Sequence, residues 1–182
     1  RGARGRTHHI HDSKKAAGIV RQRPGGGPGH MPGRRTLTAE NMIRVKDIAE
    51  AVERTAPLNF QDDYDNSGLQ VGFPSAEVRK VLVCLDVTEA VVQEAADKGC
   101  GLIVSHHPLL FRALRQVSDS TYQQRCAVSA IRSGIAIYSA HTSLDNAPGG
   151  VNHEIASRIG LGGLEWLSPK PGGADAGSGL VG

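Results

Sequence analysis

Residues 78–105, VRKVLVCLDVTEAVVQEAADKGCGLIVS, decide the fold class of this chain. The stretch 78–87 is mostly apolar and β-branched, which predicts a strand, and residues 102–105 predict a second one. Between them, Thr88 is a suitable N-cap for a helix over residues 89–98, which Gly99 would end. Apolar strands joined by such a helix are typical of a parallel βαβ unit, so the sequence predicts an α/β protein.

The alternation of strands and helices continues toward the C-terminus. Residues 121–133 predict a helix, residues 135–140 a third strand, and residues 151–159 a last helix. Gly134 and Gly160 would end the two helices. We therefore expect a mainly parallel or mixed sheet with flanking helices.

The segment before the first strand contains one further predicted helix. Apolar residues recur at helical spacing over residues 45–52, and Pro57 would end this helix. Residues 60–72 are rich in Asp, Asn and Gly and predict a loop.

Composition divides the chain into three parts. Residues 1–41 hold nine of the 21 Lys and Arg residues but only two acidic residues, together with eight Gly, so we expect a disordered basic tail. Residues 42–167 form the predicted α/β lobe, and residues 168–182 form a Gly/Pro-rich linker that is cut short. Because the tail carries a formal +7 and the rest −4, a basic nucleic-acid-binding body is not expected.

Several functional classes lack their sequence signals. No apolar run approaches the roughly 18–20 residues of a membrane span, and no apolar segment typical of a secretory signal follows the N-terminus. Cys84, Cys100 and Cys126 are isolated and odd in number, which indicates buried thiols in a reducing compartment, and we expect a cytoplasmic protein. Phosphate-binding loops, dinucleotide-binding loops and a nucleophile elbow are also missing.

The candidate chemistry follows the three predicted strands. In a parallel α/β sheet, ligands bind beyond the carboxyl ends of the strands. The first strand leads into Asp86, the second into His106 and His107, and the third into the segment from His141 to Asp145. Imidazole and carboxylate groups suit Zn, Fe, Mn, Co or Ni, so a divalent metal site is predicted at this edge.

Simpler roles for these residues remain open at this point. Histidines are often hydrogen-bonded core residues, and Asp145 begins a sequence with strong turn character. His153, within the last predicted helix, is expected at the surface. Asp86 and His141 are expected to act as catalytic or orienting side chains rather than as ligands.

Four motifs in this order carry a family resemblance: YDNSGLQVG at 64–72, SHHPL at 105–109, HTSLD at 141–145 and GGVN at 149–152. Together they resemble the YbgI-like family, also known as GTP cyclohydrolase 1 type 2 homologues or dinuclear metal centre proteins. The resemblance runs from about residue 42 to residue 182.

The resemblance implies a toroidal homohexamer with two metal ions in each complete site. His106, His107 and Asp145 match the family's ligand positions, whereas a further His and Glu near the family's C-terminus have no counterpart in this sequence. The chain therefore resembles the incomplete N-terminal lobe of a two-lobe fold. With three matched ligands, we expect it to bind one ion at best, and weakly.

The function implied by the family is metal-dependent hydrolysis of a nucleotide-like or phosphorylated small molecule. Asp86, His141 or Ser105 would then orient ligands or move a proton, and the short chain alone is expected to be inactive. The alternative is a non-catalytic metal-binding oligomer or interaction scaffold. Neither alternative involves a membrane.

Overall fold

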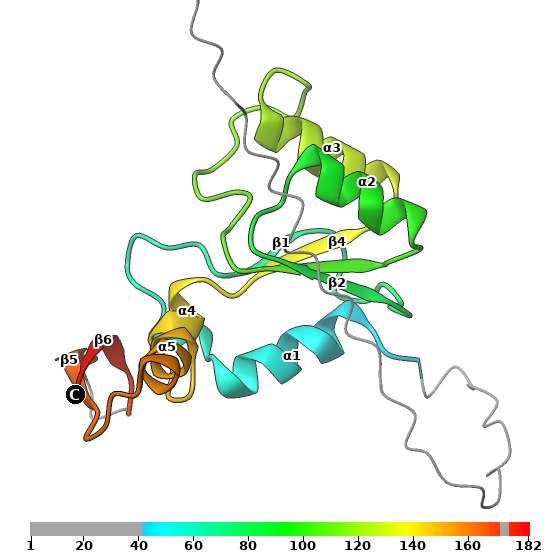
Figure 1. The fold of residues 1–182 in the computed structure, drawn as a ribbon. Helices are drawn as coiled ribbons and strands as arrows, with labels where there is room; N and C mark the ends of the chain where they lie inside the picture. Colours follow the sequence, from blue (N-terminus) through cyan, green and yellow to red (C-terminus); the bar gives the residue numbers. More distant parts are fainter. Residues whose placement is uncertain (1–41, 172–174) are drawn as a thin grey trace, which may run out of the picture.

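A four-stranded mixed sheet forms the centre of the molecule (Figure 1). The computed structural model describes residues 42–171 and 175–182, so the predicted tail over residues 1–41 lies outside the described residues. The strands are β1 (Gly68–Val71), β2 (Val81–Cys84), β3 (Leu102–Ser105) and β4 (Ala136–Ser139). Their order is β1-β4-β3-β2, with β2, β3 and β4 parallel and β1 antiparallel to β4. The predicted α/β class with a mixed sheet is therefore confirmed.

Helices cover both faces of this sheet (Figure 1). Helices α2 (Glu89–Asp97) and α3 (Tyr122–Arg132) lie side by side on one face, and α1 (Val45–Thr55) lies on the other. Thr88 and Thr121 cap α2 and α3, because each hydroxyl accepts a hydrogen bond from a main-chain N–H of the first turn.

The core consists of two apolar layers, one on each face of the sheet. Leu82, Ile103 and Ile137 point toward α2 and α3, whereas Leu102 and Tyr138 point toward α1. This split follows from the alternation of side chains along each strand. The three cysteines are free and buried, as predicted, and burial raises the pKa of the Cys84 and Cys126 thiols to about 11.

Strand β1 is the main difference between the predicted and the observed secondary structure of the lobe. Its residues lie in the segment expected to be a loop, because four residues flanked by Asp, Asn and Gly give little strand signal. Gly68 begins the strand with a φ of +117°, and Leu69 pairs with Tyr138 of β4. The addition of β1 places the Asp/Asn-rich segment beside the carboxyl end of the parallel strands.

The C-terminal segment also differs from the expected linker. It contains an antiparallel pair, β5 (Glu165–Pro169) and β6 (Gly177–Val181), which follows α4 (Thr142–Asp145) and α5 (Val151–Ile159). Buried Asn146 ties this pair to the lobe: its side-chain oxygen accepts from Ser178 and its carbonyl from Gly177. The Gly and Pro residues suggested a linker because they interrupt the side-chain pattern of a strand. The observed β5–β6 pair instead forms through main-chain hydrogen bonds between the two strands.

Within the described residues, no helix is long and apolar enough to cross a membrane.

Candidate metal centre

The carboxyl ends of three neighbouring parallel strands bring the candidate residues together. Asp86 follows β2, His106 and His107 follow β3, and His141 follows β4. Because β3 lies between β2 and β4, these side chains meet at one edge of the sheet, as predicted.

Two buried serines fix the backbone where the paired histidines leave β3. Ser105 and Ser139 lie in register on adjacent strands, with hydroxyl oxygens 2.8 Å apart. The Ser105 hydroxyl donates to the carbonyl of His107 at 2.9 Å, and the His107 N–H donates to the carbonyl of Leu85 at 2.9 Å. Ser105 is 2% exposed, and its hydrogen bonds hold the backbone at this turn.

Three imidazoles form a compact cluster. One ring nitrogen from each of His106, His107 and His141 lies within 4.8 Å of the others. The ring centroids are 4.9 to 5.6 Å apart. His141, predicted to orient ligands or assist catalysis, is therefore grouped by the geometry with the two predicted ligands.

The partners of these rings determine which nitrogen carries the proton. Nδ1 of His106 lies 3.2 Å from the carbonyl oxygen of Ala140, Nδ1 of His107 lies 2.7 Å from Asp86, and Nδ1 of His141 lies 2.8 Å from Asp65. Carbonyl and carboxylate oxygens accept hydrogen bonds, so each Nδ1 is the donor. In the neutral rings, Nε2 then has a lone pair available for a metal ion.

Asp65 is a residue of the candidate site that sequence reasoning missed. Its side chain is fully buried, and burial opposes its ionisation. Hydrogen bonds from Thr142, His141 and Ser67 overcome that effect and lower the pKa of Asp65 to about 2. The residue stands in the quoted motif 64–72, but an Asp in a loop rich in Asp and Asn looks like an ordinary turn residue.

Asp145 lies beside the cluster rather than within it. Its Oδ1 is 3.7 Å from Nε2 of His106, and Asn152 donates to its main-chain carbonyl at 2.9 Å. Burial raises the pKa of Asp145 and lowers that of His106, where the neighbouring imidazoles also disfavour a positive charge. The lowered pKa favours neutral His106, which is the form that binds metal.

Asp86 and His153 complete the set of predicted positions. Asp86 contacts the Nδ1 of His107, which fits the orienting role expected for it. His153 differs from the surface position expected: its Nδ1 is buried without a hydrogen-bond partner among the described residues, and its ring packs against Trp166 at 4.9 Å. Because His153 faces the β5–β6 pair, it belongs to the packing of α5.

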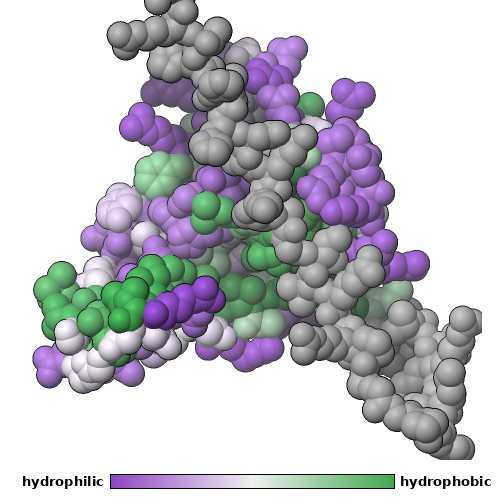
Figure 2. Space-filling view, in the orientation of Figure 1, coloured by the Kyte–Doolittle hydropathy of each residue, from purple (hydrophilic) through white to green (hydrophobic). Residues whose placement is uncertain are grey.

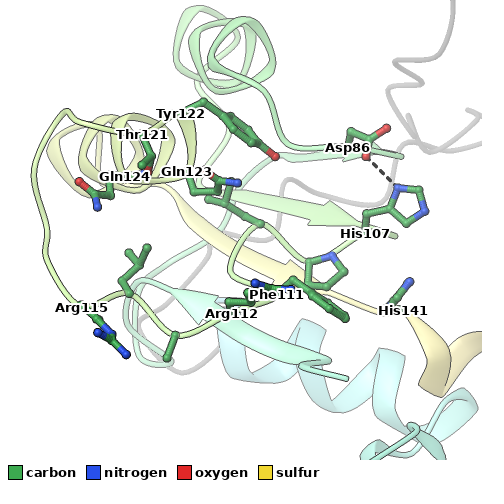
Figure 3. Close-up of a pocket in the computed structure, with 14 residues that line it drawn as sticks. Asp86, His107, Phe111, Arg112, Arg115, Thr121, Tyr122, Gln123, Gln124 and His141 are labelled. Carbon is green, nitrogen blue, oxygen red and sulfur yellow. Dashed lines mark hydrogen bonds and ion pairs between the residues drawn. The ribbon is translucent and has the colours of Figure 1, made fainter. Parts of the chain in front are cut away.

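A cavity of about 600 Å³ opens beside the histidines (Figure 3). His107, His141 and Asp86 line one end, and the segment between β3 and α3 supplies much of the remaining wall, including Phe111, Arg112 and Arg115. A small molecule in this cavity would contact the imidazole cluster.

Fold and site together define an α/β protein with a trihistidine cluster at the carboxyl edge of a mixed sheet. A family model described as Duf34/NIF3 (NGG1p interacting factor 3) matches residues 43–182. The chain therefore belongs to the DUF34/NIF3 family, and the family resemblance seen in its motifs is confirmed.

Curated relatives agree with this assignment. The chain is 37% identical over 139 residues to the "GTP cyclohydrolase 1 type 2 homolog" of Clostridium perfringens, which covers 76% of this chain and 53% of that protein. It is 32% identical over 130 residues to the "NIF3-like protein 1" of Drosophila melanogaster, covering 71% of this chain and 44% of that one. The chain thus spans about half the length of these relatives.

Solved structures show the same fold. The Bacillus cereus protein related to NIF3 superposes with a TM-score of 0.66 at 38% identity, covering 71% of this chain and 35% of that one. Reduced HcgD from Methanocaldococcus jannaschii gives 0.63 at 32% identity, with 69% and 50% coverage. Protein ybgI, at 19% identity and a TM-score of 0.56 over 69% of this chain and 49% of that one, is similar in fold.

Proposed function

We propose that this chain is the metal-binding lobe of a hydrolase that acts on a nucleotide-like or phosphorylated small molecule. The observation that carries the proposal is the cluster of three imidazoles, each held through Nδ1, two of which (His107 and His141) line the cavity.

The donor set fits a divalent transition metal ion. Nitrogen and carboxylate donors suit Zn, Fe, Mn, Co or Ni, and here they are His106, His107 and His141, with Asp145 beside them. Donor atoms in a tetrahedral zinc site lie about 3.4 Å apart, because Zn–N distances are about 2.0–2.1 Å. The ring nitrogens, which lie within 4.8 Å of one another, would therefore have to move closer together to bind one ion.

The number of donors limits how many ions this lobe can hold. A structural zinc ion takes about four protein ligands and a catalytic one about three. Three histidines and Asp145 thus serve one ion well, whereas the second ion of the dinuclear site implied by the family would need donors from outside this chain.

The chain's own residues would orient the metal-binding histidines and position the substrate. Bound divalent ions act as Lewis acids and make water a better nucleophile at neutral pH. Asp86 and Asp65 hold the rings of His107 and His141 in a fixed orientation, and the cavity positions the substrate against the same edge of the sheet. Hydrolysis also agrees with the name of the relatives, "GTP cyclohydrolase 1 type 2 homolog".

The test is a hydrolysis screen with nucleotides and phosphomonoesters as substrates, in the presence of Mn²⁺ or Zn²⁺. The chain is compared with its His106→Ala/His107→Ala variant, and the Clostridium perfringens relative serves as the longer reference. We expect metal-stimulated turnover by the reference, slow or absent turnover by the chain, and none by the variant. Metal binding without turnover by either wild-type protein would contradict the hydrolase and favour a metal-binding scaffold.

We also propose that the protein assembles as a homohexamer in the cytoplasm, as the family resemblance implies. Large apolar side chains remain exposed at the end formed by α5 and the β5–β6 pair, where they gather in the space-filling view (Figure 2): Ile155, Ile159, Leu167 and Val181. Such a surface is suited to burial against another protein. Light scattering should give six times the chain mass, and a monomer would contradict the assembly.

A further inference from the structure

We propose that Arg112 and Arg115 form an anion-recognition end of the cavity, which binds a phosphate group of the ligand while the histidines face its reacting end. This inference rests on the proposed function, because it names the part of the substrate that the cavity selects. The bound molecule would be a small phosphorylated compound with a planar ring.

The two ends of the cavity carry different chemistry (Figure 3). In the close-up, Asp86, His107 and His141 lie at one side, Arg115 lies at the other, and Arg112 and Phe111 lie between them. A ligand that spans the cavity from His107 and His141 toward Arg115 therefore passes Arg112 and Phe111 on the way.

The charge of the lining favours an anion. Apart from the histidines, the charged side chains that line the cavity are those of Arg112, Arg115 and Asp86. Asp86 is already in contact with His107 at 2.7 Å, whereas within the described residues no ion pair involves either arginine. Arginine binds phosphate through two parallel N–H···O bonds, so this pair has the donors and the charge that a phosphate group requires.

The base of the arginine segment is anchored although its side chains are exposed. Leu109 is 4% exposed and packs into the core. At the next residue, the Leu110 N–H donates to Gln70 at 2.8 Å and the Leu110 carbonyl accepts from Asn66 at 2.6 Å. Gln70 and Asn66 belong to the motif that also contains Asp65, so one segment positions both ends of the cavity.

Phe111 supplies a surface for a planar group. It is 45% exposed, and its ring lies 6.2 Å from His141 and 6.4 Å from Tyr64 between centroids. A base or another flat ring could stack here between the phosphate at the arginines and the reacting bond at the histidines.

The test measures binding of guanosine 5′-monophosphate and guanosine to the full chain by titration calorimetry in EDTA. EDTA removes divalent metal ions, so binding of the phosphate group to a metal ion at the histidines cannot account for the measured affinity. We expect the monophosphate to bind better than guanosine and to lose about tenfold or more in affinity in Arg112→Ala/Arg115→Ala, with guanosine unchanged. Arg112→Lys/Arg115→Lys should keep part of the affinity, because it retains the charge but loses the paired geometry.

Two control variants isolate the effect. Arg158→Ala removes an arginine paired with Glu154 on α5, outside the cavity lining, and should leave the affinity unchanged. Arg132→Ala removes an arginine in the last turn of α3 that lies outside the cavity lining, and it should also leave the affinity unchanged. Thermal unfolding within about 2 °C of wild type would show that the arginine variants are folded.

Either of two results would overturn the anion site. One is equal affinity of wild type and the double alanine variant for the monophosphate; the other is no preference for it over guanosine up to about 10 mM. Because the measurement needs neither metal nor turnover, a failed hydrolysis screen with intact phosphate binding would contradict the proposed function alone.

Discussion

The two ends of the cavity are built in different ways. At the histidine end, every imidazole has an Nδ1 partner, and the Asp65 behind His141 is fully buried. At the arginine end, the main chain is anchored at Leu109 and Leu110, but the side chains beyond them are exposed. The proposed metal site thus stands on hydrogen-bonded strand ends, and the proposed anion site stands on an exposed segment.

Removal of the buried Asp65 carboxylate should destabilise the histidine end and have the largest effect of the changes considered. In Asp65→Asn, an amide replaces an acceptor of hydrogen bonds from His141, Thr142 and Ser67, so some donors lose their partner. We expect the free energy of unfolding to fall by about 2–4 kcal/mol. Urea unfolding measures it, with exposed Asp63→Asn as the matched control. A change equal to that of the control would show that Asp65 does not hold the histidine end.

The lowered pKa of Asp65 also predicts that the free energy of unfolding falls at acidic pH. The pKa of Asp65 is about 2 in the folded protein against an ordinary value of 3.8, so its contribution is complete above pH 3.8 and is lost as pH falls toward 2. The contribution is about 2 kcal/mol. Urea unfolding between pH 5 and pH 2 should show a steeper loss for wild type than for Asp65→Asn. Parallel curves would contradict the assignment.

Loss of the Asp86 contact should have a more local consequence. Asp86 is exposed and orients only His107, so Asp86→Asn should weaken metal binding by about 10–100-fold without large destabilisation. Competition with a chelating dye measures the affinity. Asp97→Asn, an exposed carboxylate on α2, provides the control. Unchanged metal affinity would show that His107 needs no orienting partner.

The smallest effect is expected where the arginine segment is anchored. Gln70→Ala removes the acceptor of the Leu110 N–H and should lower the free energy of unfolding by about 0.5–1.5 kcal/mol. Hydrogen exchange should rise at Leu110 and the residues after it, while metal affinity stays at the wild-type value. An equal loss of metal affinity would mean that the two ends are not independent.

The sequence predicts the parallel part of the fold well, because its signals are local. The helix expected over residues 151–159 coincides with α5, and the strand expected over residues 102–105 coincides with β3. Strands β1 and β6 escape prediction, since short glycine-containing strands depend on pairing with partners that are distant in sequence.

The candidate site shows the same division. His106, His107 and Asp86 are recognisable because they directly follow apolar strands, and the rule for strand ends places them together. The contact between Asp65 and His141 joins residues 76 positions apart, and the anchoring of Leu110 by Gln70 spans 40 positions. Such contacts depend on tertiary structure, so local patterns in the sequence do not reveal them.

The most direct test of the account is the metal content of the full chain. Because His8, His9 and His11 could bind metal on their own, they are replaced by alanine in all samples. After loading with Zn²⁺ and dialysis, elemental analysis should find about one ion per chain. Adding His106→Ala, His107→Ala and His141→Ala should reduce this to zero. Equal metal content with and without the three histidines would contradict the metal centre.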